Sequence, residues 1–153
     1  MRAEKDLGFS QSVDPPGTVR FTLPSNHRSI RDGLQGLFAL DLLTPLTPES
    51  RGAVEIVLAE VLNNVVEHAY ADFPGRIEIW ITRREDFLFI RIVDDGLPMP
   101  GGDLPYGKAL RAHDLPEGGF GWQLIRNLSH ELTYQRDGQH NILGFCIGVD
   151  YQG

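Results

Sequence analysis

The stretch Glu60-Val61-Leu62-Asn63-Asn64-Val65-Val66-Glu67-His68-Ala69-Tyr70 places polar side chains at helical spacing among apolar residues. Glu60, Asn64 and His68 follow one another at intervals of four residues, so on a helix they share one face, with neighbouring Cβ atoms about 5 to 6 Å apart. Because Mg²⁺ prefers oxygen ligands, a carboxylate and a carboxamide placed in this way can hold one ion together. The alternative is a solvated helix edge, since charged residues on helices are mostly exposed.

The residues before this stretch predict that it ends a long helix. Thr47 is a suitable N-cap and Pro48 suits the first helical position, and the apolar spacing from there predicts a helix to about Ala71. An earlier helix, capped by Ser25 or Asn26, is predicted from its own apolar spacing.

Alternating apolar residues predict the strands. Residues 18–23 form a first strand, 77–82 and 87–92 read as a hairpin, and 131–134 with 142–149 form a final pair. Helical spacing returns at 120–128. The order favours an α+β fold, a two-layer sandwich in which a mixed, mostly antiparallel sheet carries helices on one face.

Asp94-Asp95-Gly96 directly follows the predicted hairpin. A carboxylate at a strand end that opens into a pocket can accept the exocyclic amine of adenine, and Gly96 permits the close backbone approach that a flat base requires. The alternative is a simple turn, because Asp-Gly is a common turn pair.

Gly118-Gly119-Phe120-Gly121 opens the next helix. Unhindered backbone N–H groups at a helix N-terminus favour phosphate, because the helix dipole is positive there. Residues 97–118 lie between the two glycine segments and predict a lid, since long loops inside compact domains are usually functional or mobile. Lys108 in this lid could reach a γ-phosphate, with a solvated loop charge as the alternative.

In this order and at these separations the three segments resemble the N, G1 and G2 boxes of the GHKL ATP-binding fold. The closest resemblance is to the small bacterial serine/threonine kinases that act as anti-sigma factors, the RsbW and SpoIIAB type, and it covers nearly all of the chain beyond residue 17. It implies ATP and Mg²⁺ as cofactors, with Glu60 as catalytic base and Asn64 as metal ligand. The other expected nucleotide-binding residues are Asp94, Gly96, Lys108, Gly119 and Gly121.

The resemblance implies a partner switch. The protein would phosphorylate a STAS-domain anti-anti-sigma protein and sequester a sigma factor or similar target. A homodimer through the early strand and helices is also implied, and the apolar residues Leu34, Leu37, Phe38 and Leu42-Leu43 give it support.

Two departures from the family pattern keep other functions open. Pro98 stands where a second glycine is expected, and the last strand lacks the family's Gly-Thr pair near Leu143. A catalytically weak or inactive module that binds ATP or a partner is therefore one alternative. The separate catalytic domain of a histidine kinase is another.

The composition narrows the function classes further. The chain has 153 residues and a formal net charge of −7, with Lys and Arg scattered, which argues against nucleic acid as the main ligand. No run approaches the roughly 18 apolar residues of a membrane span, and Met1 to Asp6 lacks an apolar signal core. A cytoplasmic protein is expected, with a flexible leader at 1–17 and one ATPase domain at 18–153.

Overall fold

The computed structural model describes residues 10–13, 17–102, 104 and 119–153. The strands are β1 (Ser10–Val13), β2 (Thr18–Pro24), β3 (Arg76–Arg84), β4 (Phe87–Asp94), β5 (His130–Asp137) and β6 (His140–Gly148). The α-helices are α1 (His27–Leu37), α2 (Pro48–Asn64) and α3 (Gly119–Leu128). A π-helical turn (Val65–Ala69) continues α2, and a 3₁₀ turn (Pro100–Gly102) follows β4.

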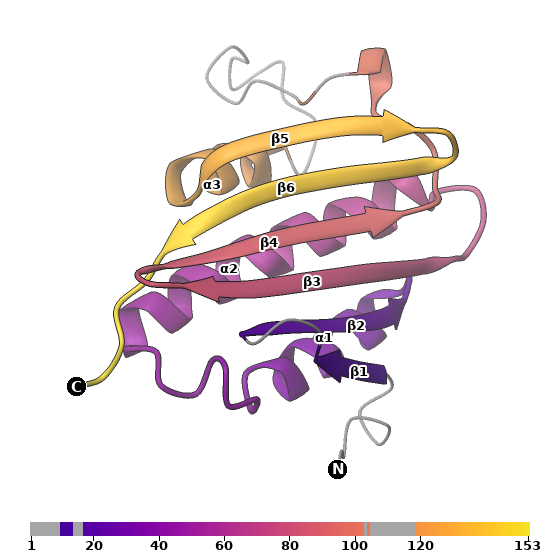
Figure 1. Cartoon of the computed structure of the whole chain (residues 1–153). Helices are drawn as coiled ribbons and strands as arrows, with labels where there is room; N and C mark the ends of the chain where they lie inside the picture. Colours follow the sequence, from indigo (N-terminus) through magenta and orange to yellow (C-terminus); the bar gives the residue numbers. More distant parts are fainter. Residues whose placement is uncertain (1–9, 14–16, 103, 105–118) are drawn as a thin grey trace.

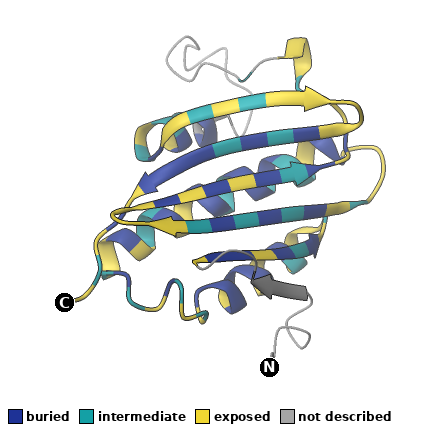
Figure 2. Ribbon diagram, viewed as in Figure 1, coloured by how far each residue is buried: buried dark blue, intermediate teal, exposed yellow. Residues whose placement is uncertain are grey.

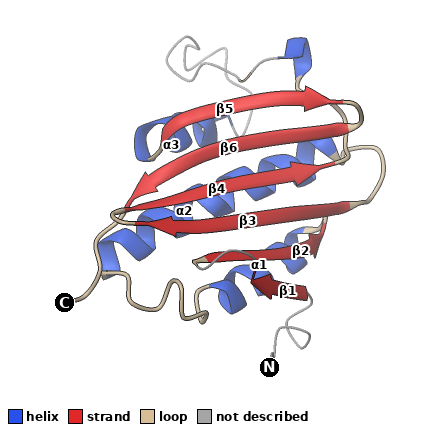
Figure 3. Ribbon diagram, in the orientation of Figure 1, coloured by secondary structure: helices blue, strands red, loops and turns tan. Residues whose placement is uncertain are grey.

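The described strands form one six-stranded sheet in the order β1-β2-β3-β4-β6-β5. Neighbouring strands are antiparallel throughout, and the three α-helices cover one face of the sheet (Figures 1 and 3). The predicted α+β two-layer sandwich is confirmed. Both predicted hairpins are present as β3–β4 and β5–β6.

Strand β1 lies inside the segment expected to be a leader without regular structure. Ser10 pairs with Thr22 and Val13 pairs with Val19, so β1 extends the sheet beyond β2. The sequence pattern missed it because a strand edge offers unpaired backbone N–H and C=O groups, which a short segment can satisfy without alternating apolar side chains. The division into a leader and a domain at residue 18 stays a prediction.

The helix starts follow the predicted capping chemistry. Asn26 accepts a hydrogen bond from the Ser29 backbone N–H at 2.8 Å and begins α1. Thr47 accepts one from Ser50 at 3.3 Å and begins α2, with Pro48 at the first helical position. Each cap satisfies a backbone donor that has no partner inside the helix.

The core fills the space between the sheet and the helices, and buried positions alternate with less buried ones along β3 and β4 (Figure 2). Ile77, Ile79 and Ile81 of β3 are fully buried, and their neighbours Trp80 and Thr82 are less buried on the opposite face. Each buried isoleucine contributes roughly 1.5 to 3 kcal/mol relative to an exposed one.

The apolar residues that supported a homodimer belong to this core. Leu34, Leu37, Phe38 and Leu43 are all buried, and Leu42 packs against them. The segment after α1 lies against the core, so its apolar side chains are buried inside the domain. These side chains therefore give no support to a dimer interface.

Candidate nucleotide site

Helices α2 and α3 meet where the first and third predicted segments were expected to converge. A Cβ atom added to Gly121 would lie 2.3 Å from Glu60 Oε1 and 3.8 Å from Asn64 Nδ2. Glu60, Asn64 and Gly121 are thus neighbours, although they come from segments about 60 residues apart in the sequence. A glycine at 121 leaves the space that the Glu60 carboxylate occupies.

The Asn64 side chain is buried, with 8% of its surface exposed. Its Nδ2 atom has no hydrogen-bond partner among the residues that the structure describes. A buried amide without a partner costs about 1 to 3 kcal/mol, so its presence calls for an explanation. A bound group with oxygen atoms would supply one: the carboxamide oxygen suits Mg²⁺, and the amide N–H suits a phosphate oxygen. These residues fit the magnesium and phosphate groups that the motifs predict.

The backbone winding changes directly after Asn64. The π-helical turn continues α2 to Ala69, and the Tyr70 N–H donates to the Val65 carbonyl. Such turns are rare and occur frequently at functional sites. The regular spacing of the predicted stripe ends here, and His68 is exposed while Asn64 is buried.

Asp94 ends β4 and is 5% exposed. It pairs with Ile77 across the strands, so its side chain lies on the helix-covered face of the sheet. Asn141 Nδ2 and the Gly96 N–H each donate to Asp94 Oδ1 at 2.8 Å, whereas no described residue donates to Oδ2. Burial raises the pKa of the Asp94 carboxyl, and the hydrogen bonds from Asn141 and Gly96 lower it in part. The Oδ2 atom can therefore accept a hydrogen bond from the exocyclic amine of a base.

Asn141 is a site residue that the sequence analysis did not identify. It stands opposite Asp94 in the β4–β6 ladder and donates a hydrogen bond to the Asp94 carboxylate, on the strand that lacks the family's Gly-Thr pair. Its position follows from the register of the β4–β6 ladder, in which Phe87 pairs with Gly148 and Asp94 pairs with Asn141. Pairing between strands so far apart in the sequence leaves no local signal, so the sequence pattern did not identify Asn141.

Gly96 approaches the end of α2 closely. A Cβ atom there would lie 2.3 Å from the Ala69 carbonyl oxygen, and the Leu97 N–H donates to that oxygen at 2.7 Å. Tyr70 holds the same turn, since its hydroxyl donates to the Arg76 carbonyl at 2.6 Å and accepts from the Asp95 N–H at 2.8 Å. The small size of Gly96 is therefore required by this packing, and its role toward a base stays a prediction.

The two groups of residues lie along one helix. Glu60, Asn64 and Gly121 gather around the last turns of α2, and the Asp94 turn rests against Ala69, five residues beyond Asn64. At about 1.5 Å per residue, that interval corresponds to about 7.5 Å of α-helical rise, so the two groups lie at different heights along the helix. The arrangement can hold a base at one end and phosphates at the other.

A family model for the histidine kinase-like ATPase domain matches residues 22–147. The chain belongs to this family. The ATPase domain is also similar to the serine-protein kinase RsbW of Bacillus cereus strain AH187 and to that of Bacillus thuringiensis subsp. konkukian, each 32% identical over 89 residues. The matched stretch is 55% of this chain and 56% of each relative, so the comparison spans about half the length of either protein. The resemblance to RsbW-type kinases is confirmed.

Several predicted positions of the ATPase domain lie at or beyond the edge of the described residues. Lys108 and most of the predicted lid, residues 105–118, lie outside them. Gly119 is the first residue of α3, and its role toward a phosphate stays a prediction. Pro98 is exposed, just before the 3₁₀ turn. No helix in the described part of the chain combines the length and apolar character needed to cross a membrane.

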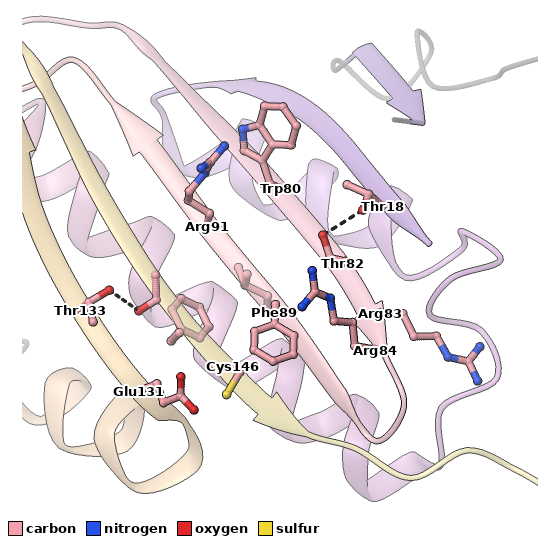
Figure 4. A pocket seen from close by; sticks show the side chains of 13 residues that line it. Thr18, Trp80, Thr82, Arg83, Arg84, Phe89, Arg91, Glu131, Thr133 and Cys146 are labelled. Carbon is pink, nitrogen blue, oxygen red and sulfur yellow. Dashed lines mark hydrogen bonds between the residues drawn. The ribbon is translucent and has the colours of Figure 1, made fainter. Parts of the chain in front are cut away.

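The outer face of the ATPase domain's sheet carries a separate hollow of about 580 Å³ (Figure 4). Its walls include Arg84, Phe89, Arg91 and Thr133, with the buried thiol of Cys146 among them. The guanidinium groups of Arg20 and Arg91 each lie 5.0 Å from the centre of the Trp80 ring. Asp94 faces the opposite, helix-covered side, so this hollow is not part of the nucleotide site. Arginine and exposed aromatic side chains together are typical of protein contact surfaces.

Substituting Gly96 with Ala is expected to destabilise the ATPase domain by about 1 to 3 kcal/mol, because the added methyl would overlap the backbone carbonyl of Ala69. Thermal denaturation measures the change. Gly138→Ala is a useful comparison, since that position has a φ of 62° but open space around it, so it reports backbone strain without a clash. A Gly96→Ala variant as stable as the wild type would show that the turn is not packed as described.

Proposed function

We propose that this protein is an ATP-dependent serine/threonine protein kinase of the anti-sigma type. The observation that supports it is the group of Glu60, Asn64 and Gly121. There the buried Nδ2 atom of Asn64, which has no hydrogen-bond partner among the described residues, lies beside a carboxylate and the first turns of α3. Membership of the histidine kinase-like ATPase family and the similarity to relatives named serine-protein kinase RsbW support the proposal.

Each residue has a role in this proposal. Asp94 accepts the adenine amine through Oδ2, and Gly119 and Gly121 offer backbone N–H groups to the phosphates. Asn64 would hold Mg²⁺ through its side-chain oxygen; when bound, that ion neutralises charge on the phosphate oxygens. Glu60 orients the acceptor hydroxyl and takes its proton. Lys108 would add a cation from the lid.

The proposed protein partners are those that the resemblance to RsbW-type kinases implies. The phosphorylation substrate is a STAS-domain anti-anti-sigma protein, and the sequestered target is a sigma factor or a comparable regulator. A cytoplasmic location is proposed with them. A homodimer stays a proposal as well, and the described aromatic residues Phe87 and Phe89 on the outer sheet face offer it an exposed surface.

Titration calorimetry with Mg-ATP tests nucleotide binding, and transfer of radiolabelled γ-phosphate to the cognate STAS-domain protein tests the kinase. We expect binding that needs the metal, and labelling of a serine or threonine on the antagonist. Binding without transfer would point to an inactive module, and transfer to a histidine would point to a histidine kinase. Absence of any adenine nucleotide binding would overturn the proposed function.

A further inference from the structure

Three side chains from β5 and β6 converge behind Asp94. Tyr134 Oη donates to Asn141 Oδ1 at 2.5 Å and accepts from the Met99 N–H at 3.0 Å. Arg136 Nη1 donates to the same Asn141 oxygen at 3.0 Å and to the Gly96 carbonyl at 2.7 Å. The pair thereby holds the backbone of residues 96–99, at the root of the predicted lid.

This network sets the orientation of the Asn141 amide. A guanidinium group has only donors, so the atom of Asn141 that faces Arg136 must be the oxygen. Nδ2 then points to the other side, where Asp94 Oδ1 and the Leu97 carbonyl each lie 2.8 Å away. Both amide protons have acceptors. Rotating the Asn141 amide by 180° would place its NH₂ group against the donors of Tyr134 and Arg136.

The fixed amide in turn fixes the carboxylate. Asp94 Oδ1 accepts two hydrogen bonds, one from Asn141 Nδ2 and one from the Gly96 backbone N–H. Since no described residue donates to Oδ2, that atom is the acceptor left for a ligand. Adenine presents an amino group at its 6 position and can donate to Oδ2. Guanine presents a carbonyl oxygen there, and two acceptors in contact repel. A site built to bond one group rejects an analogue that lacks it, because its own polar atom is left unpaired.

We propose that Asn141, Tyr134 and Arg136 form a positioning relay that presents Asp94 Oδ2 as a hydrogen-bond acceptor and so selects adenine over guanine. The inference rests on the proposed function, since it needs the nucleotide to bind at Asp94. In the proposed site, none of the three residues contacts the base. They act through the carboxylate and through the turn at Gly96.

The relay also predicts a pH dependence. A proton on Asp94 would sit on Oδ2, because Oδ1 already accepts two hydrogen bonds, and the acceptor would become a donor. Burial raises the pKa of Asp94 and the Asp95 charge adds to this, whereas Asn141 and Arg136 lower it. Tyr70 faces the same turn through its hydroxyl, and His140 holds the Asp95 carboxylate. ATP affinity should fall as the pH drops through the pKa of Asp94, and loss of Arg136 should move that fall to higher pH.

Calorimetric Kd values for Mg-ATP and Mg-GTP, measured across a pH series, test the relay. Wild type is expected to prefer ATP by about 100-fold or more, and Asn141→Leu should reduce that preference to about tenfold or less, chiefly by weakening ATP binding. Asn141→Thr, which keeps a hydroxyl donor, should restore much of it. Arg136→Ala should raise the pH at which ATP binding is half lost, and Gln135→Ala, an exposed substitution on the same strand, should change neither quantity.

The outcomes separate this inference from the proposed function. If wild type binds no ATP, the proposed function fails and the relay fails with it. If wild type binds ATP but Asn141→Leu keeps the wild-type ratio of ATP to GTP affinity, the relay alone is refuted. An equal loss of ATP and GTP binding would also refute it, since that would indicate a merely structural role. If Asn141→Leu does not fold in a thermal scan, the pH profile of Arg136→Ala decides the question. A shift of the loss of ATP binding to higher pH supports the relay, and an unchanged pH dependence refutes it.

Discussion

Replacing Asp94 with Asn is expected to reduce ATP affinity by about 100-fold while making the protein more stable at neutral pH. The loss of affinity comes from the two hydrogen bonds that Asp94 accepts, and the gain in stability comes from the burial of its charge. Asn141 Nδ2 and the Gly96 N–H donate to Oδ1, so the carbonyl oxygen of the new amide would occupy that position. Its NH₂ group would then stand in place of Oδ2 and oppose the adenine amine, donor against donor. Calorimetry with Mg-ATP measures the loss.

The gain in stability follows from the sign of the pKa shift. Because the folded state raises the pKa of Asp94 above its ordinary value of 3.8, the folded protein binds more protons than the unfolded chain between those two values. The contribution of Asp94 to the free energy of unfolding therefore falls as the pH rises through this window. Asp94→Asn has no such titration. Its Tm should exceed that of wild type at pH 7, and the difference should shrink toward acid pH.

The neighbouring Asp95→Asn is the matched control. Asp95 is exposed and its carboxylate bonds to His140 at the surface, so this variant should bind ATP within about threefold of wild type, as surface changes usually do. If Asp94→Asn keeps its ATP affinity or melts at a lower temperature than wild type at pH 7, the assignment of Asp94 as a buried acceptor for adenine is wrong.

Replacing Glu60 with Gln is expected to lower the rate of phosphoryl transfer by about 10²- to 10⁴-fold, the range that general base catalysis supplies. The carboxamide keeps the size of the carboxylate but cannot take a proton. ATP affinity should stay within about threefold, because in the proposed site Glu60 faces the acceptor hydroxyl and not the nucleotide. Labelling of the cognate STAS-domain protein measures the rate, and calorimetry measures the affinity.

Two further variants make this test specific. Glu55→Gln changes an exposed residue of the same helix and should leave transfer unchanged. Gly121→Ala places a methyl group where Glu60 Oε1 lies; since that atom ends a flexible side chain, the fold should tolerate the change while transfer slows. Full activity of Glu60→Gln toward the antagonist would remove Glu60 from the mechanism.

The amino-acid sequence by itself determined the helices and strands from β2 onward and the order of the motifs. Helix starts at Asn26 and Thr47, the alternation of Ile77, Ile79 and Ile81, and the place of Asp94 at a strand end all follow from neighbouring residues. Such signals are local: capping, periodicity and turn chemistry act within about four residues along the chain. They were sufficient to predict the fold class, whereas the family followed from the resemblance of the three segments to the N, G1 and G2 boxes.

Only the tertiary structure decided which distant groups meet. Asn141 supports Asp94 because of the β4–β6 register, and Gly121 faces Glu60 because α3 packs on α2. Gly96 is small because Ala69 lies against it, and β1 exists because β2 offers it an edge. Each of these contacts depends on how elements far apart in sequence are placed side by side, and no periodicity or cap within one element contains that information.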